Sequence, residues 1–88
     1  MKFTVVSLPS VDDTQIELWL SAPDRKAVSA AANWIERQLK IDPLTKVTAV
    51  DDVYFIRRDP LVALCKISVD DRLVTIIDVH RANDRESE

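Results

Sequence analysis

The stretch Val53–Asp84, VYFIRRDPLVALCKISVDDRLVTIIDVHRAND, decides the fold of this chain. Asp59-Pro60 separates two apolar runs, because proline cannot donate to a backbone ladder and is tolerated at the first residue of a strand. Asp70-Asp71 then joins two runs rich in Leu, Val and Ile, a pattern typical of a hairpin even without glycine. The stretch therefore predicts three consecutive strands, the last of which ends with Asp78–Arg81.

The N-terminal half predicts one strand followed by two helices. Residues 2–7 alternate apolar and polar side chains, as a half-buried strand does. A short helix is expected over residues 12–20, with Ser10 or Asp12 as its N-cap. A longer helix ends near Lys40, and one side of it is apolar, which suits a helix laid on a sheet. This apolar stripe consists of Val28, Ala31, Ala32, Ile35 and Leu39.

The segment after the second helix is the least patterned part of the chain. Asp42-Pro43 closes the helix, and residues 45–52 form a connection that has room for an edge strand around residues 47–49. The element order β-α-α-β-β-β predicts an α+β domain, a small and mainly antiparallel sheet with two helices packed on one face. We expect residues 1–81 to form this single domain and residues 82–88 to form a solvated tail.

Composition limits the classes of function. With 88 residues, 47% hydrophobic and 31% charged, and no apolar run long enough to span a bilayer, the chain is expected to be a cytoplasmic protein without a membrane partner. The absence of glycine excludes a glycine-rich phosphate loop, and a single cysteine, Cys65, excludes an internal disulfide. With one histidine besides, no metal and no cofactor is expected. The net charge of −3 is opposite to the basic surface with which proteins coat nucleic acid.

Pairing across the predicted hairpin assigns each side chain to a face of the sheet. If Val69 and Arg72 flank a two-residue turn, the residues paired beneath the helices are Ile67 with Val74, Cys65 with Ile76, and Ala63 with Asp78. The pairs on the opposite, uncovered face are Ser68 with Leu73, Lys66 with Thr75, Leu64 with Ile77, and Val62 with Val79. By the same count, His80 lies on the helix-covered face and Arg81 on the uncovered one.

The predicted uncovered face is half apolar and ringed by basic side chains, which is typical of a docking surface. The residues expected to bind a partner there are Arg57, Lys66, Leu64, Ile77 and Val79. Only one of Arg57 and Arg58 can serve a given face, because neighbouring strand residues point in opposite directions. The alternative for this pair is a solvated strand end.

His80 has two interpretations. A histidine at a strand end is either a surface residue or a group that donates and accepts protons near neutral pH. Asp78, two residues earlier on the same face of the strand, either orients His80 or pairs with a helix residue. The residues alone leave both choices open.

The chain resembles the RelE/ParE superfamily, the toxins of type II toxin–antitoxin systems. The resemblance rests on the element order, Trp19 in the short first helix, and an Ala-rich second helix that ends in Leu39–Pro43. It rests also on residues 55–81, FIRRDPLVALCKISVDDRLVTIIDVHR. It implies a RelE-like fold, a cognate antitoxin as partner, and a bacterial module of the kind used in plasmid stabilisation.

The resemblance also implies two targets. RelE-like members cut ribosome-bound mRNA with basic residues and a C-terminal acid or base, which would correspond here to Arg81, His80 and Arg58. ParE-like members bind DNA gyrase and need no such set. The segment Pro60–Leu64 lacks the arginine that the nucleases have at this strand, and no tyrosine follows Arg81. The sequence therefore favours a toxin that acts by target binding, or with weakened endoribonuclease activity. The alternative is a non-toxic, non-catalytic interaction module.

Overall fold

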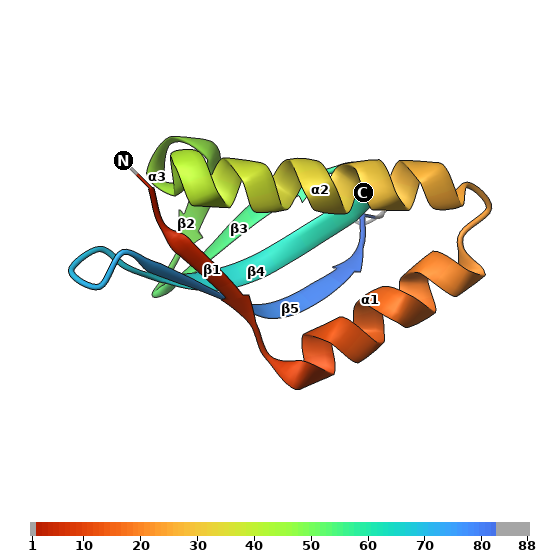
Figure 1. Ribbon diagram of the computed structural model, residues 1–88, viewed down its shortest axis with the longest axis horizontal. Coiled ribbons are helices and arrows are strands. Elements are labelled where there is room, and N and C mark those ends of the chain that lie inside the picture. Colours follow the sequence, from red (N-terminus) through yellow and green to blue (C-terminus); the bar gives the residue numbers. More distant parts are fainter. Residues whose placement is uncertain (1, 83–88) are drawn as a thin grey trace.

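The computed structural model describes residues 2–82, which form five strands and three helices (Figure 1). The elements in chain order are β1 (Thr4–Ser7), α1 (Pro9–Ser21), α2 (Arg25–Ile41), α3 (Pro43–Lys46), β2 (Thr48–Val50), β3 (Val53–Arg58), β4 (Leu61–Ser68) and β5 (Leu73–Arg81). The strands form one sheet in the order β1-β5-β4-β3-β2, in which β1 runs parallel to β5 and all other pairs are antiparallel. The predicted α+β architecture is confirmed, and the edge strand lies one residue later than expected.

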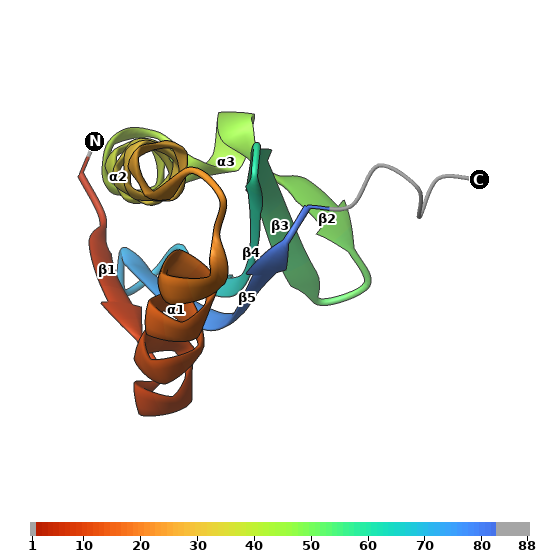
Figure 2. The ribbon, with the colours of Figure 1, turned by 90° about the vertical axis from the view of Figure 1, so that its right-hand side faces the viewer.

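Both long helices lie on the same side of β4 and β5 (Figure 2). Asp24 is the N-cap of α2, and its carboxylate accepts a hydrogen bond from the Ala27 amide at 3.1 Å. This bond satisfies one of the backbone amides of the first turn that have no partner within the helix. α1 begins earlier than predicted, at Pro9, and neither Ser10 nor Asp12 is its N-cap. Proline is well suited to this first turn because its missing amide would have no helical partner there.

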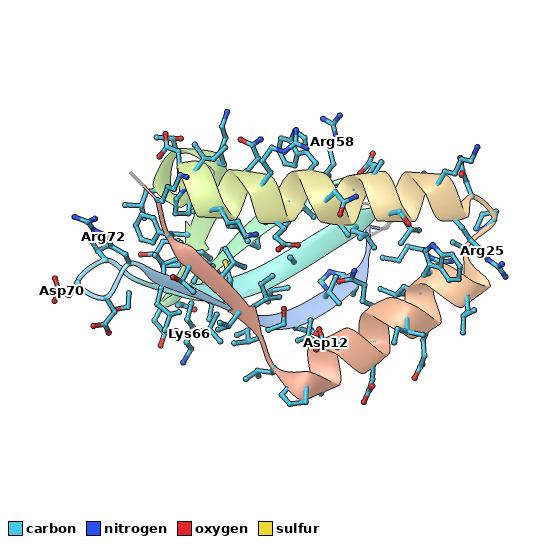
Figure 3. All side chains as sticks on the ribbon, in the orientation of Figure 1. Asp12, Arg25, Arg58, Lys66, Asp70 and Arg72 are labelled. Carbon is cyan, nitrogen blue, oxygen red and sulfur yellow. The ribbon has the colours of Figure 1, made fainter. Side chains whose placement is uncertain are left out.

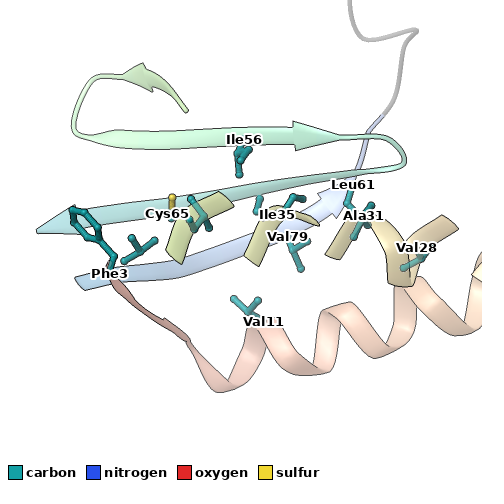
Figure 4. Close-up of a cluster of buried hydrophobic side chains, with 12 residues drawn as sticks. Phe3, Val11, Val28, Ala31, Ile35, Ile56, Leu61, Cys65 and Val79 are labelled. Atoms are coloured by element: carbon teal, nitrogen blue, oxygen red, sulfur yellow. The ribbon is translucent and has the colours of Figure 1, made fainter. Parts of the chain in front are cut away.

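The core lies between α2 and the sheet (Figure 4). The predicted apolar stripe of α2 is confirmed for its buried members Val28, Ala31, Ile35 and Leu39. The sheet contributes Ile56 from β3, the alternate residues Leu61, Ala63 and Cys65 from β4, and Val74 and Val79 from β5. Small side chains at Ala31 and Ala63 keep the helix close to the sheet, while Val11 anchors α1 to the same core.

Two of the three hairpins turn at a residue that has a positive φ, although the chain contains no glycine. Arg72 has φ 50° between β4 and β5, and Asp51 has φ 57° between β2 and β3. Ser68 pairs with Leu73, as predicted, although the turn spans four residues rather than two. The hairpin predicted from Asp70-Asp71 is therefore confirmed, and the residues next to its turn pair as predicted.

Farther along, the predicted register is wrong because β5 contains a bulge at Ile77. Cys65 pairs with Ile76, but Leu64 pairs with Asp78 and Ala63 with Val79, so one residue of β5 is left over. A bulge places an additional residue in one strand, and every side chain beyond it changes face relative to simple alternation. The expected faces of Asp78, Val79, His80 and Arg81 are therefore all reversed.

None of the helices in residues 2–82 combines the length and hydropathy needed to cross a membrane. Of the predicted tail, only Ala82 lies among the residues that the structure describes.

Candidate functional site

The face of the sheet opposite α1 and α2, which we call the open face, is covered by neither long helix. Its side chains are those that alternate with the buried core residues along each strand. From β3, β4 and β5 they are Val53, Phe55, Arg57, Val62, Leu64, Lys66, Ser68, Leu73, Thr75, Asp78 and His80. The face thus combines apolar and charged residues, and Asp78 lies directly across from Leu64.

The open face contains a depression beside the β2–β3 hairpin, toward the β2 edge of the sheet. Apolar side chains of three strands line it, Val50, Val53, Phe55 and Leu64, and Asp51, Asp52 and His80 complete its wall. An exposed apolar surface with polar margins is the kind of surface on which proteins bind other proteins.

At one end of the open face, Arg57, Val62 and His80 lie in a row across β3, β4 and β5. Because neighbouring strands are about 4.8 Å apart, the backbones of Arg57 and His80 are separated by roughly 10 Å. Arg57 donates from Nε to Asp59 Oδ1 at 2.7 Å, within the same turn. Asp78, also on this face, accepts a hydrogen bond from the Val79 amide at 2.9 Å.

The two arginines that the resemblance suggested for catalysis, Arg58 and Arg81, lie on the helix side. Arg58, Leu61 and Arg81 form a row there, with the buried Leu61 between the two arginines. The Arg58 guanidinium lies 4.9 Å from the centre of the Trp34 ring, above α2 (Figure 3). Arg81 donates to the hydroxyl of Ser21, at the end of α1, at 3.1 Å.

The predicted catalytic set is therefore not brought together. Arg58 and Arg81 share the helix side, whereas His80 lies on the open face with Arg57. Alternation had predicted the reverse for His80 and Arg81, and the bulge at Ile77 is the reason.

Of the predicted partner-binding residues, Arg57, Lys66 and Leu64 lie on the open face, and Ile77 is the unpaired residue of the bulge. The expected position of Val79 is wrong, because it is 4% exposed beneath the helices and packs in the core. The prediction that Val62, Leu64 and Lys66 of β4 lie on the uncovered face is confirmed.

Cys65 is buried and free, as its apolar strand predicted. Burial raises the pKa of its thiol to about 11 by desolvation, because the thiolate would lose its hydration. The thiol is therefore inert near neutral pH. Within residues 2–82, no group of three His, Cys, Asp or Glu side chains is placed to hold a metal ion.

The sequence interpretation missed the contribution of the β2–β3 hairpin to the open face. Val53, Phe55 and the pair Asp51-Asp52 line the depression, yet residues 45–52 had been treated as a connection. A signal was present, since Asp51-Asp52 is flanked by short apolar runs just as Asp70-Asp71 is.

Comparison with known proteins identifies the architecture. The sequence matches no protein-family model and no curated protein. The structure is similar to a chain of the toxin–antitoxin complex RelBE2 from Mycobacterium tuberculosis, with a TM-score of 0.77, 19% identity, and coverage of 94% of this chain and 95% of that one. It is also similar to a chain of the archaeal RelE–RelB complex from Pyrococcus horikoshii OT3, with a TM-score of 0.65, 14% identity, and coverage of 96% and 99%. The chain therefore has a RelE-like fold, as its resemblance to that superfamily predicted.

Proposed function

We propose that this chain is the toxin component of a toxin–antitoxin module and that it acts by binding a macromolecular target through the open face. The observation that carries the proposal is the apolar depression on that face, in a fold shared with chains of two toxin–antitoxin complexes.

The charges of the open face favour a protein target. Asp51, Asp52 and Asp78 lie on or beside the same face as Arg57 and Lys66, so a phosphate backbone would meet carboxylates together with the cations. Apolar side chains at the centre with charges at the rim are the usual anatomy of a protein interface. A target such as DNA gyrase fits this chemistry better than bare RNA does.

The proposed antitoxin is a protein that covers the open face and so keeps the target away. The two structural neighbours come from toxin–antitoxin complexes, which supports a protein partner for the present chain. Occlusion of Phe55 and Leu64 would be sufficient, because these residues form the apolar centre of the depression.

The experiment is induced expression of the chain alone in a bacterial host. Growth should stop, the DNA-damage response should rise, and cellular transcripts should stay intact. Normal growth while soluble protein accumulates would contradict the proposal and would favour a non-toxic interaction module.

A second candidate is an mRNA endoribonuclease, favoured by the row of Arg57, Val62 and His80. An imidazole can exchange protons with the attacking and leaving oxygens, and a guanidinium can stabilise the charge that develops on the phosphate. On this hypothesis, expression leaves cut transcripts, and the cleavage is lost in His80→Ala and in Arg57→Ala. Arg81→Ala, on the helix side, should retain it.

A further inference from the structure

The outward side of α1 carries large apolar side chains that the fold does not bury. Ile16 and Leu20 are 56% and 55% exposed, one helical turn apart and on the side away from the buried Val11. Trp19 beside them is 37% exposed. Monomeric proteins seldom leave three such residues on one helix without a partner.

This apolar side is bordered by acidic residues. Asp12, Asp13 and Glu17 are exposed on α1, and the helix contains no lysine or arginine (Figure 3). Asp13, Ile16, Glu17 and Leu20 recur at spacings of three and four, so the carboxylates and the apolar side chains share one surface. We call this surface, with Asp12 and Trp19, the α1 ridge.

A groove between α1 and α2 adjoins the ridge. Asp12, Gln15, Ile16 and Trp19 of α1 line it on one side, and Val28 and Ser29 of α2 on the other. The indole Nε1 of Trp19 donates to the Ser29 hydroxyl at 3.1 Å, and the Arg25 guanidinium lies 4.9 Å from the ring centre. These two contacts hold the indole in place, so the groove is preformed for an apolar side chain.

Charge decides what fits the ridge. A second copy of this chain, placed on it by a two-fold axis, would bring α1 against α1. The carboxylates of both copies would then share one interface, with no lysine or arginine on α1 to pair with them. Like charges facing each other across an interface are unfavourable. An amphipathic helix with apolar residues on one side and lysine or arginine at its margins matches both the apolar side chains and the carboxylates.

We propose that the α1 ridge is a docking surface for a basic amphipathic helix of another protein. The surface lies on the helix side of the sheet, so the inference goes beyond the proposed function of the open face and does not rest on it. One partner could occupy both surfaces at once only by wrapping around an end of the sheet.

The experiment is titration of the isotope-labelled chain with a synthetic helical peptide of leucine and lysine, about 18 residues or five turns long. Backbone amides of α1 and the indole of Trp19 should shift, and the open face should not. Ile16→Gln/Leu20→Gln should weaken binding at least about tenfold, since apolar anchors dominate such interfaces. Asp13→Lys should weaken it several-fold.

Matched controls come from the β4–β5 turn, where Val69 is 54% exposed and is followed by Asp70. Val69→Gln and Asp70→Lys repeat the same chemistry outside the ridge and should leave the affinity unchanged. An equal loss in these variants would show that the peptide binds any acidic surface, and the proposal would be wrong. Concentration-dependent dimers of the chain that Ile16→Gln/Leu20→Gln abolishes would contradict it as well.

These outcomes are separable from those of the growth assay. A chain that stops growth but binds the peptide elsewhere refutes the ridge and leaves the toxin proposal standing. A chain that binds the peptide through the ridge but does not stop growth supports the ridge and refutes the toxin proposal.

Discussion

The helix-covered face and the open face of the sheet contain similar side chains but surround them differently. On the covered face, Arg58 contacts Trp34 and Arg81 contacts Ser21, so both arginines hold the helices to the sheet. On the open face, Arg57 bonds Asp59 in its own turn, and the apolar residues beside it line a depression. An arginine near a strand end therefore reveals little about function until its face is known.

The largest expected difference between the faces is the stability cost of a buried charge. Val79→Asp places a carboxylate in the core and should destabilise the protein by about 3–5 kcal/mol, a large share of the stability of a domain of this size. Val62→Asp, on the neighbouring strand but on the open face, should cost less than about 1.5 kcal/mol, because water can reach the carboxylate. Urea unfolding followed by circular dichroism measures both, and equal losses would contradict the assignment of the faces.

The bulge can be tested by deleting single residues. Removal of Ile77 leaves a regular ladder in which Asp78 still pairs with Leu64, so the protein should stay folded with a loss of about 1–2 kcal/mol. Removal of Leu64 instead turns Ala63 and Leu61 toward the open face and should prevent folding. A folded Leu64 deletion, or an unfolded Ile77 deletion, would show that the register is different.

The buried thiol on the covered face gives the sheet a dependence on pH. The pKa of Cys65 is raised from 9.0 to about 11 in the folded state, so the folded protein favours the neutral thiol. Its contribution to stability is complete below pH 9 and is lost as the pH rises from 9 to about 11, by up to about 2–3 kcal/mol. The difference in unfolding free energy between the wild type and Cys65→Ala should shrink over that range, and a constant difference would contradict the shift.

The smallest expected effect concerns Arg81. Its hydrogen bond to Ser21 is exposed, and such contacts contribute within about 1 kcal/mol. Arg81→Ala should therefore unfold at nearly the same urea concentration as the wild type. A loss of stability comparable to that of Val79→Asp would contradict the weak contribution expected of this contact.

Most of the fold could be predicted from local patterns. The spacing of Val28, Ile35 and Leu39 predicted the buried side of α2, and Asp70-Asp71 predicted the hairpin. These features depend on residues close together in the chain, which is why the sequence reveals them. The parallel pairing of β1 with β5 had no such local signal.

The candidate site could be predicted only up to the bulge. Counting alternate residues is correct from Ser68 back to Cys65 and fails at Leu64, because β5 has one more residue than β4 there. Isoleucine has no property that marks it as a bulge residue, so nothing at Ile77 signalled the shift. This one residue exchanged the faces of His80 and Arg81.

The central claim, that the open face is the functional surface, is tested most directly by host growth under induced expression of three chains. Leu64→Glu charges the centre of the depression, and Arg81→Ala alters the helix side as a matched control. We predict that the wild type and Arg81→Ala stop growth, whereas Leu64→Glu, soluble and folded by circular dichroism, does not. Normal growth with the wild type, or arrest that is lost in Arg81→Ala and kept in Leu64→Glu, would contradict the account.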